Sequence, residues 1–206
     1  MHKLAIAAFV LALAVALATG CSTAPLLRYY VVTPLEGTVA AAPSSAAVPG
    51  PSVVVAGVRL PQHLERPQLV TRGGDNQLRL EEFHQWGGNL AKDLTRVLAE
   101  NLSQLLRSDA VVAAPHTLRG RPDYRVEVEV LRFERAGDAR VYLTAKWWLQ
   151  RGADGAPLAG PTTTLTSEPL PASPTFEPTV AAMSLAYGEL SRAIAQAIAR
   201  QSKVAQ

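Results

Sequence analysis

The stretch LPQHLERPQLVTRGGDNQLRLEEFHQW, residues 60–86, decides the fold because it joins a predicted buried strand to the first strong helix of the chain. Two prolines restrain its backbone, and the residue before a proline is pushed toward an extended conformation, so we expect a strand to start at Pro67. Residues 73–76, GGDN, are types that tolerate positive φ, and Leu alternates with polar residues over 77–81. The pattern predicts a β-hairpin. Three ring-bearing residues, Phe83, His84 and Trp86, follow it just before helical periodicity begins.

Strand-like segments also precede this stretch. Residues 28–32, RYYVV, have the aromatic and β-branched content of a strand. Residues 52–60, SVVVAGVRL, form a continuous apolar run, which is typical of a strand covered on both faces. Between the two, residues 36–51 are rich in Ala, Pro, Ser and Gly and carry one charge, so we expect a loop there.

An amphipathic helix is predicted directly after the stretch. Asn89 can cap its start, because a side-chain oxygen at that position accepts a hydrogen bond from the first helical turn. Apolar residues then recur at helical spacing with mixed charges between them: Leu90, Leu94, Val97, Leu98, Leu102 and Leu105. Mixed charges favour packing on a sheet, because a membrane-surface helix is usually richer in Lys and Arg.

The second half of the chain predicts more strands and one long helix. A short strand is expected at 110–114, and the alternating segments 123–133 and 140–150 form a second hairpin with one buried face. Residues 161–167 resemble an edge strand. Residues 179–203 form the last helix, with an apolar stripe made of Val180, Met183, Tyr187, Leu190, Ile194 and Ile198. We therefore expect a single α/β domain of the α+β type, with a mostly antiparallel sheet and two main amphipathic helices on one face.

The N-terminus has the pattern of a secretory signal peptide over residues 1–20. Lys3 precedes an uncharged apolar run that is too short for a transmembrane helix, which needs roughly 20 residues. Cys21, the only cysteine, resembles the acceptor of a bacterial lipobox. We predict that Cys21 carries a diacylglyceryl group and an N-acyl chain, with a short tether at 21–27 and no other cofactor. The alternative is an ordinary signal peptide cleaved nearby.

The residue after the cysteine points to a destination. In diderm bacteria an Asp at that position commonly retains lipoproteins in the inner membrane, so Ser22 resembles the pattern sent to the outer membrane. The chain from Cys21 to Arg28 spans roughly 20 to 25 Å even when fully extended. We therefore expect a body held close to the periplasmic face of the outer membrane.

Composition fits one domain and excludes a nucleic-acid partner. Removing 20 of the 206 residues leaves 186, enough for a single core over 28–206. Loss of Lys3 lowers the net charge from +3 to +2, and the basic residues are scattered singly. A nucleic-acid-binding surface would gather them into a patch.

Three segments carry a resemblance to a known family. LPQHLERPQLVTR, DNQLRLEEFHQW and DLTRVLAENLSQLL resemble the PqiC family of envelope lipoproteins, also described as auxiliary lipoprotein components of ABC-type transport systems. The YYVV segment and the lipobox fit the same layout. The Ala/Pro-rich insertion after Glu36 and the glycine pair at 87 and 88 depart from it.

The resemblance implies a function in lipid trafficking between the inner and outer membranes. It also implies a periplasmic MCE-domain partner and an integral inner-membrane component, and no catalytic residue. Aromatic and Arg side chains are the usual anchors of interfaces, so the candidate partner-binding residues are Pro61, His63, Arg66, Arg72, Phe83, His84 and Trp86. For Phe83 and Trp86, packing of the helix on the hairpin is an equally good interpretation.

Catalysis and metal binding find no support in the sequence. The histidines lack metal-ligand spacing, no Gly-x-Ser-x-Gly segment is present, and residues 72–75 lack the Lys of a phosphate-binding loop. Glu81, Glu82 and His84 are the most suggestive cluster, and exposed charges at the end of a strand explain it. We predict that the protein is not an enzyme.

From the resemblance to the PqiC family we expect a lipid-anchored adaptor that docks an MCE-domain conduit at the outer membrane to maintain envelope integrity, and two alternatives stay open. The protein could carry lipid in an apolar cavity lined by Leu98, Trp147 and Ile194, or it could stabilise another envelope assembly machine. In addition, the alanines of the helix at 179–203 allow close approach of a second copy, so a homo-oligomer is consistent with the sequence.

Overall fold

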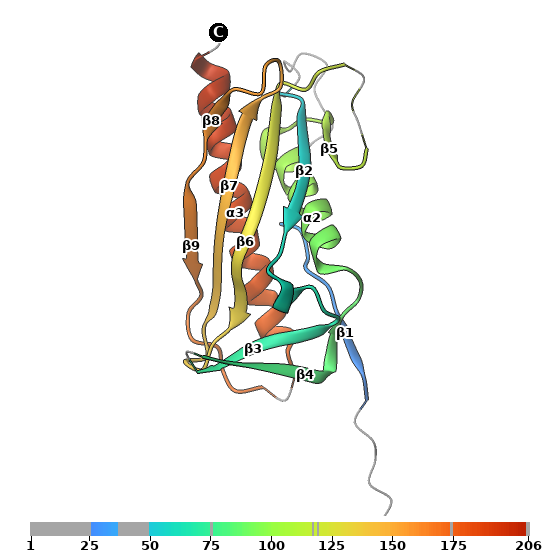
Figure 1. Ribbon diagram of the computed structural model, residues 1–206, viewed down its shortest axis with the longest axis vertical. Helices are drawn as coiled ribbons and strands as arrows, with labels where there is room; N and C mark the ends of the chain where they lie inside the picture. The colour runs from blue at the N-terminus through green and yellow to red at the C-terminus, as the bar shows by residue number, and fades with distance from the viewer. Residues whose placement is uncertain are drawn as a thin grey trace, which may run out of the picture.

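The computed structural model describes residues 26–36, 50–74, 76–116, 118, 120–173 and 175–204. The predicted signal peptide, Cys21, Asp75 and most of the predicted loop at 36–51 lie outside the described residues. Within them, one sheet lies in front of two long helices (Figure 1).

Nine strands, two α-helices and a short 3₁₀ helix make up the described part of the chain. Their bounds are β1 Arg28–Tyr30, β2 Val53–Arg59, η1 Gln62–Leu64, β3 Gln68–Gly74, β4 Gln77–Trp86, α2 Leu90–Leu106, β5 Val111–Ala113, β6 Tyr124–Arg135, β7 Val141–Arg151, β8 Pro157–Ala159, β9 Thr162–Thr166 and α3 Glu177–Val204.

The antiparallel pair β6 and β7 forms the centre of the sheet. Val126 and Val128 are fully buried, whereas Arg125 is exposed and Glu127 half-buried between them. Leu143 of β7 is fully buried in the same core. Because alternate side chains of a strand point to opposite faces, the apolar set faces the helices and the charged set forms the open face. The predicted second hairpin is confirmed.

Two strands pair with β6 on the same edge, at different positions along its length. β2 pairs with β6 in parallel from Val53 to Arg59, and β3 meets β6 only where Thr71 lies opposite Arg135. The order is β1-β4-β3-β6-β2-β5, and β7 pairs with β6, β8 and β9. The β3–β4 hairpin therefore continues the sheet beyond the end of β2.

The predicted α+β class is confirmed, and the sheet is mixed. Its longest pairing, β6 with β7, and the pairing of β3 with β4 are antiparallel, while β2 runs parallel to both β5 and β6. The expectation that residues 52–60 are covered on both faces is wrong. Val53 and Val55 are fully buried, but Val54 and Ala56 are only half-buried because helices cover one side of the sheet.

Helix α2 starts at the predicted cap. The Asn89 side chain accepts a hydrogen bond from the Lys92 backbone N–H at 3.0 Å. The helix ends where Arg107 adopts a left-handed conformation with φ of 51°. The predicted apolar stripe is buried except for Leu105, which remains 37% exposed.

Helix α3 begins two residues before the predicted start, and its predicted stripe is entirely buried. Within that stripe the hydroxyl of Tyr187 donates to the Leu94 carbonyl of α2 at 2.9 Å. Complete burial raises the pKa of the Tyr187 phenol well above its ordinary value. The hydrogen bond joins the two helices under the sheet.

The segment after β1 crosses the two helices. The Leu35 backbone N–H donates to Asn101 Oδ1 at 2.8 Å, and Asn101 Nδ2 donates to Ser191 Oγ at 3.0 Å. A Cβ at Gly188 would lie 2.5 Å from the Leu35 side chain, so the absence of a side chain permits this close approach. These contacts hold the segment that follows β1 against both helices.

Candidate functional site

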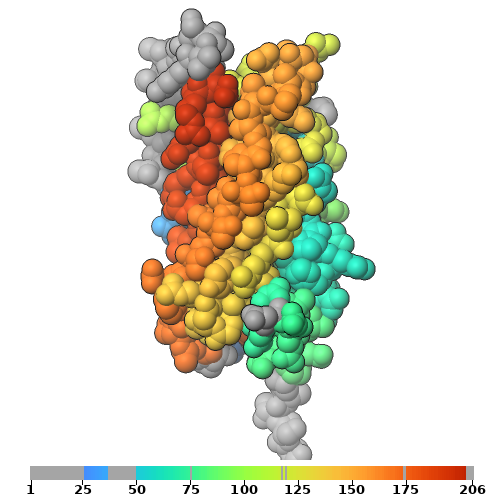
Figure 2. Space-filling model, turned by 60° about the vertical axis from the view of Figure 1, so that its left-hand side comes forward, coloured from blue at the N-terminus to red at the C-terminus, as the bar shows by residue number. Residues whose placement is uncertain are grey.

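The seven predicted partner-binding residues lie at one end of the molecule. We define the hairpin end as β1 with its flanks, residues 26–31, together with η1, β3 and β4. Figure 1 shows these elements below the lower end of α2, and Figure 2 shows the hairpin, in green, closing this end of the body. The structure thus gathers the candidates, but in different environments.

Arg72 fixes the hairpin to the central strand. Its Nε donates to Glu134 Oε1 at 2.9 Å, and Arg132 Nε donates to the same oxygen at 2.8 Å. Glu134 is fully buried, and its Oε2 accepts from the Phe133 backbone N–H at 3.2 Å. A buried carboxylate needs such partners because removal from water is costly. The geometry gives Arg72 a bracing function.

His84 joins β1 and β4 to the segment before α3. The Tyr30 hydroxyl lies 2.8 Å from His84 Nδ1, and the His84 and Phe176 rings are 4.7 Å apart. The Phe176 backbone N–H donates to the Tyr30 hydroxyl at 3.4 Å. His84 is half-buried and engaged on both sides. Its surroundings are those of a packing residue.

Trp86 lies in the core, whereas Phe83 does not. Trp86 is 6% exposed, and its backbone N–H donates to the Pro67 carbonyl at 2.7 Å. The packing interpretation, which the sequence left open, therefore fits Trp86. Phe83 is 46% exposed, so its ring is available for contact.

The remaining candidates, Pro61, His63 and Arg66, lie on or beside η1, and we call this surface the η1 shoulder. The Pro61 carbonyl accepts from the Leu64 backbone N–H at 2.8 Å and closes the turn. His63 is half-buried, and its Nε2 is buried without a hydrogen-bond partner in the described part of the chain. Arg66 is exposed. Arg66 is therefore the most exposed of the charged candidates, whereas Arg72 is half-buried.

Sequence reasoning missed the main surface feature of this end. Seven of the ten exposed large apolar side chains among the described residues lie on β4 or on β1 and its flanks. They are Leu26, Leu27, Tyr29, Val31, Leu78, Leu80 and Phe83. The alternation over 77–81 predicted a strand with a buried face, but no sequence signal indicated that this face lacks cover.

The most suggestive acidic cluster does not converge on a common point. Glu81 accepts a hydrogen bond from the Thr71 hydroxyl at 2.7 Å, while His84 contacts Tyr30. Among the described residues, no group of three or more His, Cys, Asp and Glu side chains could hold a metal ion. The described residues of this end offer a surface for binding, and the absence of enzymatic activity stays a prediction.

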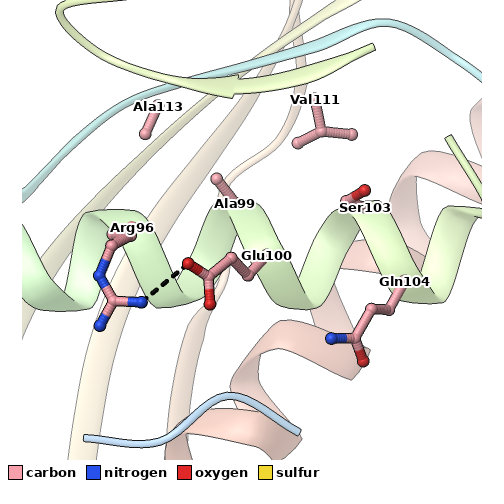
Figure 3. A pocket seen from close by; sticks show the side chains of 7 residues that line it. All are labelled: Arg96, Ala99, Glu100, Ser103, Gln104, Val111 and Ala113. Atoms are coloured by element: carbon pink, nitrogen blue, oxygen red, sulfur yellow. Dashed lines mark hydrogen bonds and ion pairs between the residues drawn. The ribbon is translucent and has the colours of Figure 1, made fainter. Parts of the chain in front are cut away.

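A pocket of about 340 Å³ lies between α2 and β5 (Figure 3). Its lining residues are Arg96, Ala99, Glu100, Ser103, Gln104, Val111 and Ala113. Figure 3 shows Ala99 and Ser103 directed toward β5, with the ion pair of Arg96 and Glu100 along the helix, 2.8 Å between Nη1 and Oε1. Four polar side chains in the lining make the pocket a poor site for an acyl chain.

The cavity residues named for the lipid-carrier alternative lie elsewhere. Leu98 and Ile194 are fully buried and Trp147 is 3% exposed, all within the core between sheet and helices. None of them lines the pocket beside β5. The packing of these three side chains gives the carrier alternative no support.

Comparison with known proteins identifies relatives. Residues 30–195 match the family described as the ABC-type transport auxiliary lipoprotein component. The comparison with curated proteins gave no match. In the part of the chain that the structure describes, no helix has both the length and the apolar character needed to cross a membrane.

Two crystal structures share the fold. One, of an uncharacterized protein, is 20% identical, covers 84% of this chain and 99% of its own, and superposes with a TM-score of 0.68. The other, of a protein from Xanthomonas campestris, is 18% identical, covers 90% of this chain and 100% of its own, and gives a TM-score of 0.63.

Proposed function

Because the chain belongs to the family of ABC-type transport auxiliary lipoprotein components, we propose that it is a lipid-anchored periplasmic subunit of an intermembrane lipid transport system. The match over residues 30–195 carries this proposal, since it runs from the last residue of β1 through most of α3 and thus covers nearly the whole described body. The family description supports association with an ABC-type transporter and a place in the cell envelope.

The anchor is acylated Cys21 in the outer membrane. Several acyl chains on one residue provide the two or more signals that stable membrane attachment requires. The described body begins at Leu26, so four residues lie between it and the cysteine, and the five steps from Cys21 to Leu26 span at most about 18 Å. With Ser22 in the following position, we assign the periplasmic face of the outer membrane.

The partner is a periplasmic MCE-domain subunit, which in turn belongs to a complex with an integral inner-membrane component. We place the contact on the η1 shoulder, where Arg66 is exposed beside the half-buried Pro61 and His63. A guanidinium group on a fixed turn is a suitable anchor, because Arg is enriched at interface hot spots. The docked subunit would connect the outer membrane to the transport system.

Affinity purification from detergent-solubilised envelopes tests this function. Wild-type protein is expected to bring down an MCE-domain subunit of an ABC-type system, and Arg66→Glu is expected to reduce its recovery about tenfold, equivalent to 1.4 kcal/mol. Arg72 and His84 are left unchanged, since both hold the hairpin in place. Arg200→Glu, an exposed position near the far end of α3, is the matched control and should recover the partner normally.

Two results would contradict the proposal. Wild-type protein that brings down no transport subunit would remove the docking function. Equal recovery with Arg66→Glu and Arg200→Glu would show that the η1 shoulder is not the contact.

The anchor has a test of its own. Cys21→Ser should abolish incorporation of labelled fatty acid, and persistent labelling would refute the assignment.

A further inference from the structure

The exposed apolar side chains of the hairpin end require an explanation of their own. Leu26 is 82% exposed and Tyr29 63%, while Leu78 and Leu80 retain 37% and 41%. Single exposed apolar residues are common on proteins, but a gathering on two paired strands marks a contact surface. β1 pairs with β4 between Arg28 and Tyr30, so the set belongs to one end of the molecule (Figure 1).

Among the described elements, neither long helix covers the exposed apolar side chains of this end. The main contacts of α2 and α3 with the sheet are to β2, β5, β6, β7 and β9. The hairpin extends past β2 and meets β6 only at Thr71 and Arg135. Rigid bracing by the Arg72–Glu134 pair keeps it in that position. An uncovered and braced apolar element is suited to contact something outside the chain.

The position of the N-terminal segment selects the occupant. The described chain begins at Leu26, within the apolar set itself, and Cys21 lies only five residues earlier. A tether of at most about 18 Å holds this end, rather than the opposite end of the body, against the lipid that carries the anchor. The distance therefore favours lipid over a soluble partner as the neighbour of these side chains.

The composition of the surface also fits a lipid–water interface. Leu side chains bury apolar area among the acyl chains, and the rings of Tyr29 and Phe83 suit the headgroup region, where aromatic residues are enriched. Arg28 and Arg79 are exposed beside them and can contact anionic phosphates. Both requirements of an interfacial site, apolar area and cationic groups, are met on one pair of strands.

We propose that two parts of the hairpin end, β4 and β1 with its flanks, enter the lipid–water interface next to Cys21 and form a second, non-covalent membrane contact, while the η1 shoulder is left to the proposed partner. This inference rests on the proposed acylation of Cys21. Two points of attachment fix the orientation of the body, with its long axis directed away from the membrane and the far ends of α2 and α3 toward the periplasm (Figure 1). The second contact therefore sets the orientation of the body on the membrane, which the anchor at one residue does not set.

Site-directed fluorescence measures the contact. Cys21 is the only cysteine and is blocked when acylated, so Leu78→Cys supplies the only reactive thiol for a polarity-sensitive dye. Leu105→Cys is the matched control, because both leucines are 37% exposed and Leu105 lies near the opposite end of α2. The acylated variants are placed in vesicles of phosphatidylethanolamine and phosphatidylglycerol that contain nitroxide-labelled lipid. Quenching should be severalfold stronger at position 78 than at 105.

Phe83→Cys gives an independent reading on the same strand and is expected to behave like position 78. Equally weak quenching at 78, 83 and 105 in acylated protein would overturn the membrane contact and leave the anchor intact. Protein whose mass shows no acyl group on Cys21 would remove the anchor and the contact with it. A dye response at 78 that requires the MCE-domain subunit, without quenching by lipid, would also overturn it and assign the surface to a protein partner.

Discussion

The two hairpins of this protein have the same alternating sequence pattern but differ in how deeply their apolar side chains are buried. In β6–β7, alternating apolar residues such as Leu143 are fully buried, because α3 covers that face. In β3–β4, Leu78 and Leu80 alternate in the same way and remain 37% and 41% exposed. Alternation thus predicts a strand with an apolar face, while the cover on that face depends on other elements.

The difference divides the molecule into a stable body and a contact end. The body holds the continuous core that extends from β2 through β7 to the two helices. The contact end is attached through a short pairing with β6, through the buried Glu134, and through Leu69, Val70 and Trp86, which belong to the same core. Stability should therefore depend on the body, and attachment to the envelope on the hairpin end.

Shortening one leucine in each hairpin gives the largest expected contrast. Leu143→Ala should lower the free energy of unfolding by about 2–5 kcal/mol, because it removes a fully buried side chain and leaves a cavity. Leu80→Ala should change it by less than about 0.5 kcal/mol. Urea unfolding followed by circular dichroism measures both. Similar losses for the two variants would contradict the division into body and contact end.

The joint between the hairpins depends on Glu134. Glu134→Gln should lower the free energy of unfolding by about 3 kcal/mol, at the low end for a broken buried pair, because Arg72 and Arg132 retain some access to water. Glu127→Gln on the open face of the same strand is the control. Its ion pairs with Arg59 and Arg125 are solvated, so a loss below about 1 kcal/mol is expected. Equal effects on urea unfolding would argue against a special joint.

The hairpin end passes into the body at the cap of α2. Asn89→Ala should lower the free energy of unfolding by about 1 kcal/mol, since the Lys92 backbone N–H would lose its acceptor. Asn89→Asp keeps an acceptor oxygen and should retain most of the stability. Thermal unfolding distinguishes the two variants, and equal melting temperatures would show that the cap contributes nothing.

The smallest predicted effect is a change in the pKa of Asp138, in the turn of the β6–β7 hairpin. The Tyr142 hydroxyl donates to Asp138 Oδ2 at 2.6 Å and lowers the pKa of that carboxyl. A carboxyl with a lowered pKa stabilises the fold above its ordinary pKa, and this contribution is lost as the pH falls through the lowered value. Tyr142→Phe should move the Asp138 pKa back toward the ordinary value of about 3.9.

Carbon NMR of the carboxyl groups follows this titration residue by residue. The pKa of Asp154 is also lowered, chiefly by the Ala156 backbone N–H, and should not respond to Tyr142→Phe. An unchanged Asp138 pKa in the variant would show that the Tyr142 hydroxyl is not the cause.

Most of the fold follows from local pattern, and the exceptions follow from distant partners. The Asn89 cap, the α3 stripe and the second hairpin depend on spacing within one segment, which the sequence displays. The extension of β4 to Trp86 depends on pairing with β1, and the open second face of β2 depends on where the helices lie. Neither of these can be deduced from residues 77–86 or 52–60 alone.

The sequence predicts seven side chains for the candidate site, and the structure gathers them at one end of the molecule but in different environments. Residues 60–86 do form one end of the molecule, and Arg66 and Phe83 are exposed there. Arg72 and His84 gain packing functions because Glu134 and Tyr30 lie far away in the sequence. The exposed leucines were missed because exposure reflects the absence of a covering element, which no local pattern encodes.

Hydrogen–deuterium exchange of the acylated chain tests the assignment of the hairpin end most directly. Exchange is compared between protein in detergent and protein in vesicles that also contain the transport partners. The account predicts slower exchange over residues 26–31 and 61–86, with β6 and β7 unchanged. Unchanged exchange at the hairpin end, or slower exchange confined to α2 or to the open face of β6 and β7, would contradict it.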